Sequence, residues 1–199
     1  ELTITGTALG RTKKSQLLLR CGAKPGDLVC VTGYTGSAGA ALEALLSGKP
    51  VSEAVLNALL EPIPRTKEAR KLAESGAVTS MMDTSDGLAM SLYDLARESH
   101  VGFKIRENSL PILREVREFV SSSEELTELS LYTGGDFELL MTINPQKLKK
   151  VQNICNLVVI GECTKYEAGI VLESPECKLI TIEQRGYQQL KAKAVDRST

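Results

Sequence analysis

The chain has 199 residues, of which 42% are hydrophobic, so it can bury a sizeable core and is not a disordered protein. Its 24 Lys and Arg residues nearly balance 25 Asp and Glu residues, for a net charge of −1, and no basic block stands out, which argues against a nucleic-acid partner. No apolar run reaches the roughly 20 residues of a membrane-spanning helix and no signal-peptide pattern is present, so we expect a cytoplasmic protein without membrane contact.

The N-terminal segment, residues 2–10, alternates polar and apolar residues and is predicted to be a strand already under way. Because the chain opens with Glu1 instead of Met, we expect a processed or truncated chain. Further along, the patterns predict strands over 28–32, 77–82, 103–105, 137–143 and 157–163, with a closing hairpin over 169–172 and 178–182. They predict helices that end at Leu46 and at Gly102, and helices over 53–60, 67–75, 113–121, 124–131 and 145–153.

Strands and helices alternate along the chain, but the closing hairpin breaks a strict β-α-β repetition. We therefore predict one α+β domain, a mixed β-sheet with helices packed on it, in preference to a doubly wound parallel sheet. No internal repeat, low-complexity tract or linker divides the chain.

Cysteine and histidine residues do not form a recognisable site. The five cysteines are Cys21, Cys30, Cys155, Cys163 and Cys177. They lie in apolar contexts without a Cys-x-x-Cys pair, which favours reduced, buried thiols over a metal site or disulfides. His100 is the single histidine, so catalytic triads and histidine-rich metal sites lose most of their support, and acid chemistry must come from carboxylates.

The most informative segment is the turn over residues 83–88, which joins a predicted strand to a predicted helix. Asp83 and Asp86 can converge there on a hard divalent cation such as Mg²⁺, and the start of the helix favours a phosphate oxygen. The competing interpretation is structural: Ser85 caps the helix, Asp86 is a favourable acid in its first turn, and none of the three side chains touches a ligand. Spacing alone favours the structural interpretation.

Two further segments contain glycines near possible ligand-binding residues. Gly33-x-x-Gly36-x-x-Gly39 lies between a strand and a helix but lacks the P-loop and dinucleotide-binding spacings, which favours close helix–sheet packing over phosphate binding. The 134–138 segment has paired glycines, and strand alternation predicts that Asp136 and Glu138 share one face, either as ligand-binding acids or as a solvated edge. No segment orders a nucleophile and a base, so the residues alone identify no catalytic group.

Taken together, these motifs resemble the thiamine-monophosphate kinase family, within the superfamily of aminoimidazole ribonucleotide synthetase, selenophosphate synthetase and a hydrogenase-maturation protein. The family patterns are "LLRSGAKPGD…VTG", "EPxPR", "DxSDGL" and "GGEDYELL". The matching residues are 19–27 (LRCGAKPGD) with 31–33 (VTG), 61–65 (EPIPR), 83–88 (DTSDGL) and 133–140 (TGGDFELL). Their order agrees with the family, and the resemblance covers nearly the whole chain.

The resemblance implies the fold of the C-terminal domain of aminoimidazole ribonucleotide synthetase for residues 1–199, with the ATP- and metal-binding N-terminal half absent. It implies transfer of the γ-phosphoryl group of ATP to thiamine monophosphate with Mg²⁺, in a homodimeric full-length protein, and an inactive isolated chain. Carried over by position, Asp83 and Asp86 resemble Mg²⁺ ligands, Ser85 an ATP-phosphate contact and Arg20 an ATP-binding arginine.

The substrate side departs from the family pattern, because the substrate-contacting glutamate falls on Gly135 and an aromatic residue falls on Leu190. Two alternatives therefore stay open. One is a superfamily enzyme with another small-molecule acceptor, as in a selenophosphate-synthetase-like or purine-pathway enzyme. The other is a non-catalytic assembly domain in which the acids before the helix act only as caps.

Overall fold

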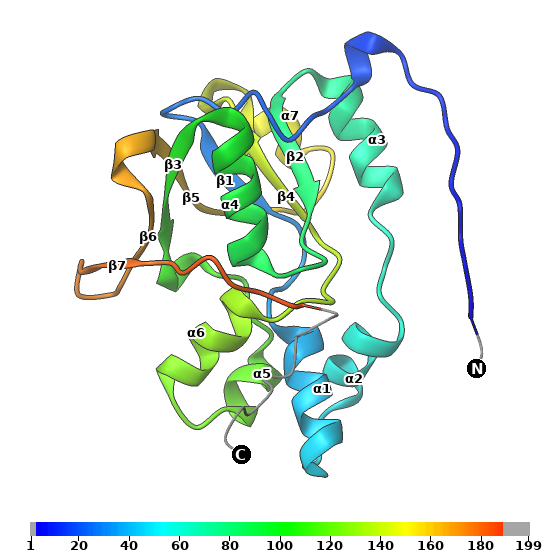
Figure 1. The fold of residues 1–199 in the computed structure, drawn as a ribbon, viewed down its shortest axis with the longest axis vertical. Coiled ribbons are helices and arrows are strands. Elements are labelled where there is room, and N and C mark those ends of the chain that lie inside the picture. The colour runs from blue at the N-terminus through cyan, green and yellow to red at the C-terminus, as the bar shows by residue number, and fades with distance from the viewer. Residues whose placement is uncertain (1–2, 189–199) are drawn as a thin grey trace, which may run out of the picture.

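The computed structural model describes residues 3–188 (Figure 1). Its strands are β1 (Leu28–Val31), β2 (Val78–Asp83), β3 (Val101–Arg106), β4 (Leu139–Ile143), β5 (Val158–Lys165), β6 (Ile170–Glu173) and β7 (Leu179–Thr181). Its α-helices are α1 (Ser37–Ser47), α2 (Glu53–Leu60), α3 (Thr66–Ser75), α4 (Leu88–Ser99), α5 (Arg114–Phe119), α6 (Ser123–Tyr132) and α7 (Leu148–Gln152). In this part of the chain, no helix has the length and apolar character needed to cross a membrane.

The strands form one seven-stranded sheet in the order β2-β4-β1-β5-β3-β6-β7. Strands β3 and β6 pair in parallel, and the other neighbouring pairs are antiparallel. The predicted α+β class and mixed sheet are therefore confirmed, as is the closing hairpin, in which β6 and β7 pair antiparallel.

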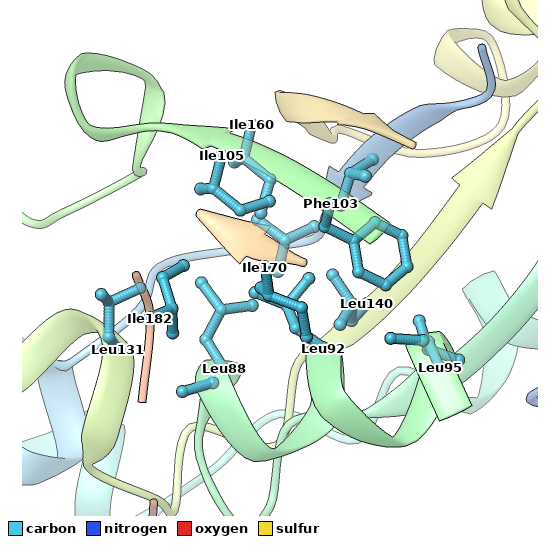
Figure 2. Packing of buried hydrophobic residues seen from close by; sticks show 14 of the residues in the cluster. Leu88, Leu92, Leu95, Phe103, Ile105, Leu131, Leu140, Ile160, Ile170 and Ile182 are labelled. Carbon is cyan, nitrogen blue, oxygen red and sulfur yellow. The ribbon is translucent and has the colours of Figure 1, made fainter. Parts of the chain in front are cut away.

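Both faces of the sheet are covered by helices, which explains why its central strands are continuously apolar. In β1, Val29 and Val31 pack toward one core cluster and Cys30 toward another. Helix α4 lies across the first face (Figure 1), where its side chains point at those of β3, β4 and β5 (Figure 2). On the second face, residues of α3 and α7, including Leu72 and Val151, complete the second cluster.

Helices α1, α2, α5 and α6 gather beyond one end of the sheet (Figure 1). They bury a third cluster of their own around Ala40, Val55, Val116 and Leu129. The first residues of α1 sit directly at the sheet end, and Ala38 is completely buried there. This packing fixes the loops that enter and leave the sheet at that end.

The predicted N-terminal strand is wrong. Residues 3–13 form neither strand nor helix, and the apolar side chains of Ile4 and Leu9 are 85% and 96% exposed. Alternation alone does not make a strand, because the backbone also needs a partner strand, and residues 3–13 pair with none of the seven strands of the sheet. Figure 1 shows the segment running outside the sheet, along the side of α3.

The predicted helix end at Gly102 is also wrong. Helix α4 ends at Ser99, its C-cap residue His100 takes the left-handed conformation with φ 55°, and Gly102 lies inside β3. A Cβ atom at Gly102 would lie 2.5 Å from the carbonyl oxygen of Gly169, so glycine is needed there for close strand contact.

The cysteines are free, as expected, but their burial differs. Cys30 and Cys163 are buried and Cys155 is partly buried, whereas Cys21 and Cys177 are exposed. The burial prediction is wrong for these two because both lie in irregular segments outside the sheet, and Cys177 lies in the β6–β7 turn with φ 60°. Burial raises the pKa of the Cys30 thiol to about 12, which makes it a poor nucleophile.

Helix α2 begins as predicted, with the Ser52 hydroxyl accepting a hydrogen bond from the backbone N–H of Val55 at 3.3 Å. Replacing Ser52 with alanine should lower the free energy of unfolding by about 1 kcal/mol, because the N–H group then loses its partner. Urea denaturation measures this loss. The control is Ser121→Ala, since the exposed Ser121 side chain forms no hydrogen bond with another described residue; equal losses in both variants would remove the capping explanation.

Candidate functional site

Three strand ends meet at the end of the sheet that faces α1. Because β1 and β2 both pair antiparallel with β4, the C-terminal ends of β1 and β2 lie beside the N-terminal end of β4. Asp83 pairs with Leu139, and Val31 pairs with Leu140. The three segments that the sequence singled out separately, residues 33–39, 83–87 and 134–138, are thereby brought together.

The Asp83–Gly87 turn carries two carboxylates. Asp83 is the last residue of β2, and both Asp83 and Asp86 are exposed. Within residues 3–188, neither carboxylate accepts a hydrogen bond or forms an ion pair; the contacts of the turn are made by its backbone and by Thr84. Two carboxylates without a partner in the described part of the chain, on a backbone held by neighbouring segments, are available to a ligand.

The competing capping interpretation of this turn is wrong. The N-cap residue of α4 is Gly87, with φ 99° and no side-chain capping bond, and the first turn of the helix contains no acid. Ser85 and Asp86 therefore lie before the helix and outside its cap. Gly87 is required by packing, because a Cβ atom there would lie 2.9 Å from the carbonyl oxygen of Thr133.

Gly135, predicted to face the substrate, lies against the turn. Its backbone N–H donates to the carbonyl oxygen of Ser85 at 3.0 Å, and its φ of 98° favours glycine. The backbone N–H of Tyr187 donates to the carbonyl oxygen of Asp86, also at 3.0 Å, so the C-terminal segment reaches the same turn. Leu190, the second predicted substrate contact, lies outside the described residues.

Arg20 is the one predicted site residue in the described part of the chain that does not contact this group. Its exposed guanidinium forms an ion pair with Asp94 of α4 at 3.0 Å. The side chain is half exposed, so donors of its planar fork are left over for another acceptor.

Asp136 connects this loop to the start of α1. Its carboxylate oxygens accept hydrogen bonds from the backbone N–H groups of Gly36 at 2.7 Å and Ala38 at 3.0 Å. Gly39 packs against Thr133, since a Cβ atom there would lie 2.2 Å from the threonine hydroxyl. The predicted close packing is present, but Gly36 and Gly39 pack against the end of α6 and Thr133, not against the sheet. Asp136 takes the N–H groups of Gly36 and Ala38.

Burial raises the pKa of the Asp136 carboxyl to about 6, against the opposing effect of the N–H groups of Ala38 and Gly36. The folded protein therefore holds a proton that the unfolded chain, with a pKa of 3.8, releases, so stability falls as pH rises from about 4 to 6. In Asp136→Asn this position no longer titrates, so the variant lacks this pH dependence. The unfolding free energy of the variant relative to wild type should increase by about 2 kcal/mol between pH 4 and 7, measured by urea denaturation. If the difference in unfolding free energy between variant and wild type does not change with pH, the raised pKa of Asp136 is contradicted.

Glu138 forms a buried ion pair that the sequence did not reveal. Its carboxylate accepts hydrogen bonds from Arg65 Nε at 2.7 Å, Arg65 Nη2 at 2.6 Å and Thr32 Oγ1 at 2.6 Å. The prediction that Asp136 and Glu138 lie on a strand is wrong, because Phe137 takes a left-handed conformation with φ 52° and β4 begins at Leu139. Both acids nevertheless point inward, and neither is a solvated edge.

The side chains at the turn fit a Mg²⁺ ion that takes only some of its ligands from the protein. The part of the chain between residues 3 and 188 contains no group of three or more His, Cys, Asp or Glu side chains that could hold a metal. Mg²⁺ commonly keeps several waters and takes one or two carboxylates together with substrate phosphates. Asp83 and Asp86 match that need in number, type and exposure.

Residues 24–173 match the family model described as AIR synthase related protein, C-terminal domain. A thiamine-monophosphate kinase from Methanospirillum hungatei is 42% identical over 151 residues, which cover 76% of this chain and 48% of that protein. One from Pyrococcus horikoshii is 36% identical over 191 residues, covering 96% and 58%.

Among solved structures, AaThiL complexed with AMPPCP and TMP is 27% identical with a TM-score of 0.71, covering 87% of this chain and 54% of that one. The chain spans about half the length of the curated relatives it matches.

Proposed function

Since the chain belongs to the family of AIR synthase related proteins, whose C-terminal domain it contains, we propose that it is the C-terminal part of a thiamine-monophosphate kinase. The observation that carries the proposal is the pair of carboxylates at the Asp83–Gly87 turn that have no partner among residues 3–188, in a chain 42% and 36% identical to proteins of that name. The AaThiL complex with an ATP analogue and TMP supports the two substrates.

In the proposed reaction, the γ-phosphoryl group of ATP moves to the phosphate of thiamine monophosphate, giving thiamine diphosphate and ADP. Asp83 and Asp86 would hold Mg²⁺, which neutralises charge on the phosphates when bound. Ser85 contacts ATP because it lies between the two acids in the turn. Arg20 contacts ATP through the guanidinium N–H groups that its ion pair with Asp94 leaves unused. The chain's own contribution is positioning, because Gly135 and Tyr187 hold the turn by its carbonyl groups.

The proposal places the protein in the cytoplasm, a reducing compartment that fits its free cysteines, and makes the full-length protein a homodimer. Residues 1–199 alone should not turn over, because the ATP- and metal-binding half expected from the family resemblance is not part of them.

One observation favours an acceptor other than thiamine monophosphate. Gly135 offers no side chain to a substrate, and a Cβ atom there would already lie 3.3 Å from Cβ of Ala38. The family resemblance implies a substrate-contacting glutamate at this position, and this chain lacks that side chain. The alternative is therefore an ATP-dependent enzyme of the same superfamily acting on another small molecule.

The test is ADP release by the natural protein that contains this chain, compared between thiamine monophosphate and other small acceptors, with and without Mg²⁺. Selective turnover with thiamine monophosphate supports the kinase and rules out the alternative acceptor. Turnover with another acceptor alone supports the alternative. Thiamine diphosphate formation by residues 1–199 alone would contradict the proposed need for the remaining half.

A further inference from the structure

A cavity of about 680 Å³ opens beside the C-terminal end of β1, next to α3. Its walls come from the segment after β1, the start of α3, the 154–157 loop between α7 and β5, and the first residue of β5. None of residues 83–87 lines it, so it is separate from the turn that carries Asp83 and Asp86. Its size falls in the range of small-molecule sites, roughly 300–1,000 Å³.

One wall is positively charged. Lys67 and Lys71 lie four residues apart on α3, so both face the cavity from the same side of the helix. Both are exposed, and neither forms an ion pair with another residue between 3 and 188. Arg65 also lines the cavity but is held by Glu138, and Glu68 lies 3.9 Å from Arg65. The two lysines repel one another, and an anion between them would relieve that repulsion.

Another part of the lining is apolar and includes an aromatic ring. Tyr34 is 49% exposed and lines the cavity together with Ile154 and Leu157. Asn156, on the same loop, adds an amide group that can donate or accept a hydrogen bond. Such a mixture of apolar surface and a few polar groups is typical of pockets that bind a small organic molecule.

From this juxtaposition of cationic and apolar walls we propose that the cavity binds a small organic phosphate with a flat, apolar body. The phosphate lies at Lys67 and Lys71, and the ring packs against Tyr34 and Leu157. This site goes beyond the proposed kinase activity and does not depend on it, because the residues of the Asp83–Gly87 turn play no part in it.

The experiment titrates the ¹⁵N-labelled 199-residue protein with phenyl phosphate, and in parallel with inorganic phosphate and phenol. Phenyl phosphate should bind more tightly than either half-ligand and should shift the amide signals of Tyr34, Asn156 and Leu157. The variant Lys67→Gln/Lys71→Gln should bind phenyl phosphate at least about tenfold more weakly, because two charge-assisted contacts are lost. Both lysines are exposed, so the variant should keep its fold and its spectrum.

The matched control is Lys149→Gln/Lys178→Gln, which removes the same charge from exposed positions outside the cavity and should bind as wild type. Glu68→Gln should tighten binding by about threefold, since it removes a like charge from the wall, and a folding defect would not produce such a gain. Equal weakening in the two lysine variants, unchanged binding in Lys67→Gln/Lys71→Gln, or shifts confined to residues 83–87 would each overturn the proposal.

Discussion

Replacing Asp86 with alanine in the natural protein that contains this chain should reduce phosphoryl transfer by at least about 10³-fold and leave its stability nearly unchanged. The carboxylate is exposed and has no partner among residues 3–188, so its removal breaks no contact within the fold. It does remove one of the two oxygen ligands proposed for Mg²⁺. The measurements are the rate of ADP release at several Mg²⁺ concentrations and the urea midpoint.

The control for this variant is Glu53→Ala, because Glu53 is an exposed acid in the first turn of α2. That substitution should cost about 0.5 kcal/mol through the helix dipole and leave turnover intact. If Asp86→Ala behaves like Glu53→Ala, with small effects on both properties, the metal-ligand role of Asp86 is wrong. A non-catalytic assembly role for the domain would then lead.

Elements with strong local signals were predictable from the sequence. Glu53–Leu60 has a serine cap before it and prolines after it, and the structure places α2 at those residues. β1 follows a dense turn signal and is continuously apolar, since helices cover both faces of the sheet. The spacing of the two acids singled out the Asp83–Gly87 turn, and the family resemblance favoured a ligand-binding role for it over a structural one. The structure adds that its carboxylates have no partner within residues 3–188.

Features that depend on distant partners were not predictable. The bond between Arg65 and Glu138 joins residues 73 apart, and no local pattern marks either as buried. Residues 3–10 alternate as a strand does, but they pair with none of the strands in the described part of the chain. Phe137 takes a left-handed conformation that local propensity disfavours, because Asp136 must reach α1 while Glu138 reaches Arg65.

Glu138→Ala should have the largest effect on stability, with a loss of about 3 kcal/mol in the free energy of unfolding. The Glu138 and Arg65 side chains are only 10% and 22% exposed, so the variant leaves a largely buried guanidinium without its bidentate partner. Thr32 loses the acceptor of its hydroxyl as well. Urea denaturation of the variant and of the wild type measures the total loss in the free energy of unfolding.

The surface pair Arg70–Glu74 supplies a matched comparison, because it joins the same residue types with side chains 84% and 47% exposed. Glu74→Ala should cost no more than about 0.5 kcal/mol.

In the double variant Arg65→Ala/Glu138→Ala, the uncompensated cation is gone, so the loss should fall short of the sum of the single losses by about 2 kcal/mol. If the single losses simply add, or if Glu138→Ala costs no more than Glu74→Ala, the buried pair does not stabilise this end of the sheet. Arg65 lines the cavity, and its bond to Glu138 holds a residue whose backbone carbonyl accepts a hydrogen bond from the N–H of Thr84 inside the Asp83–Gly87 turn.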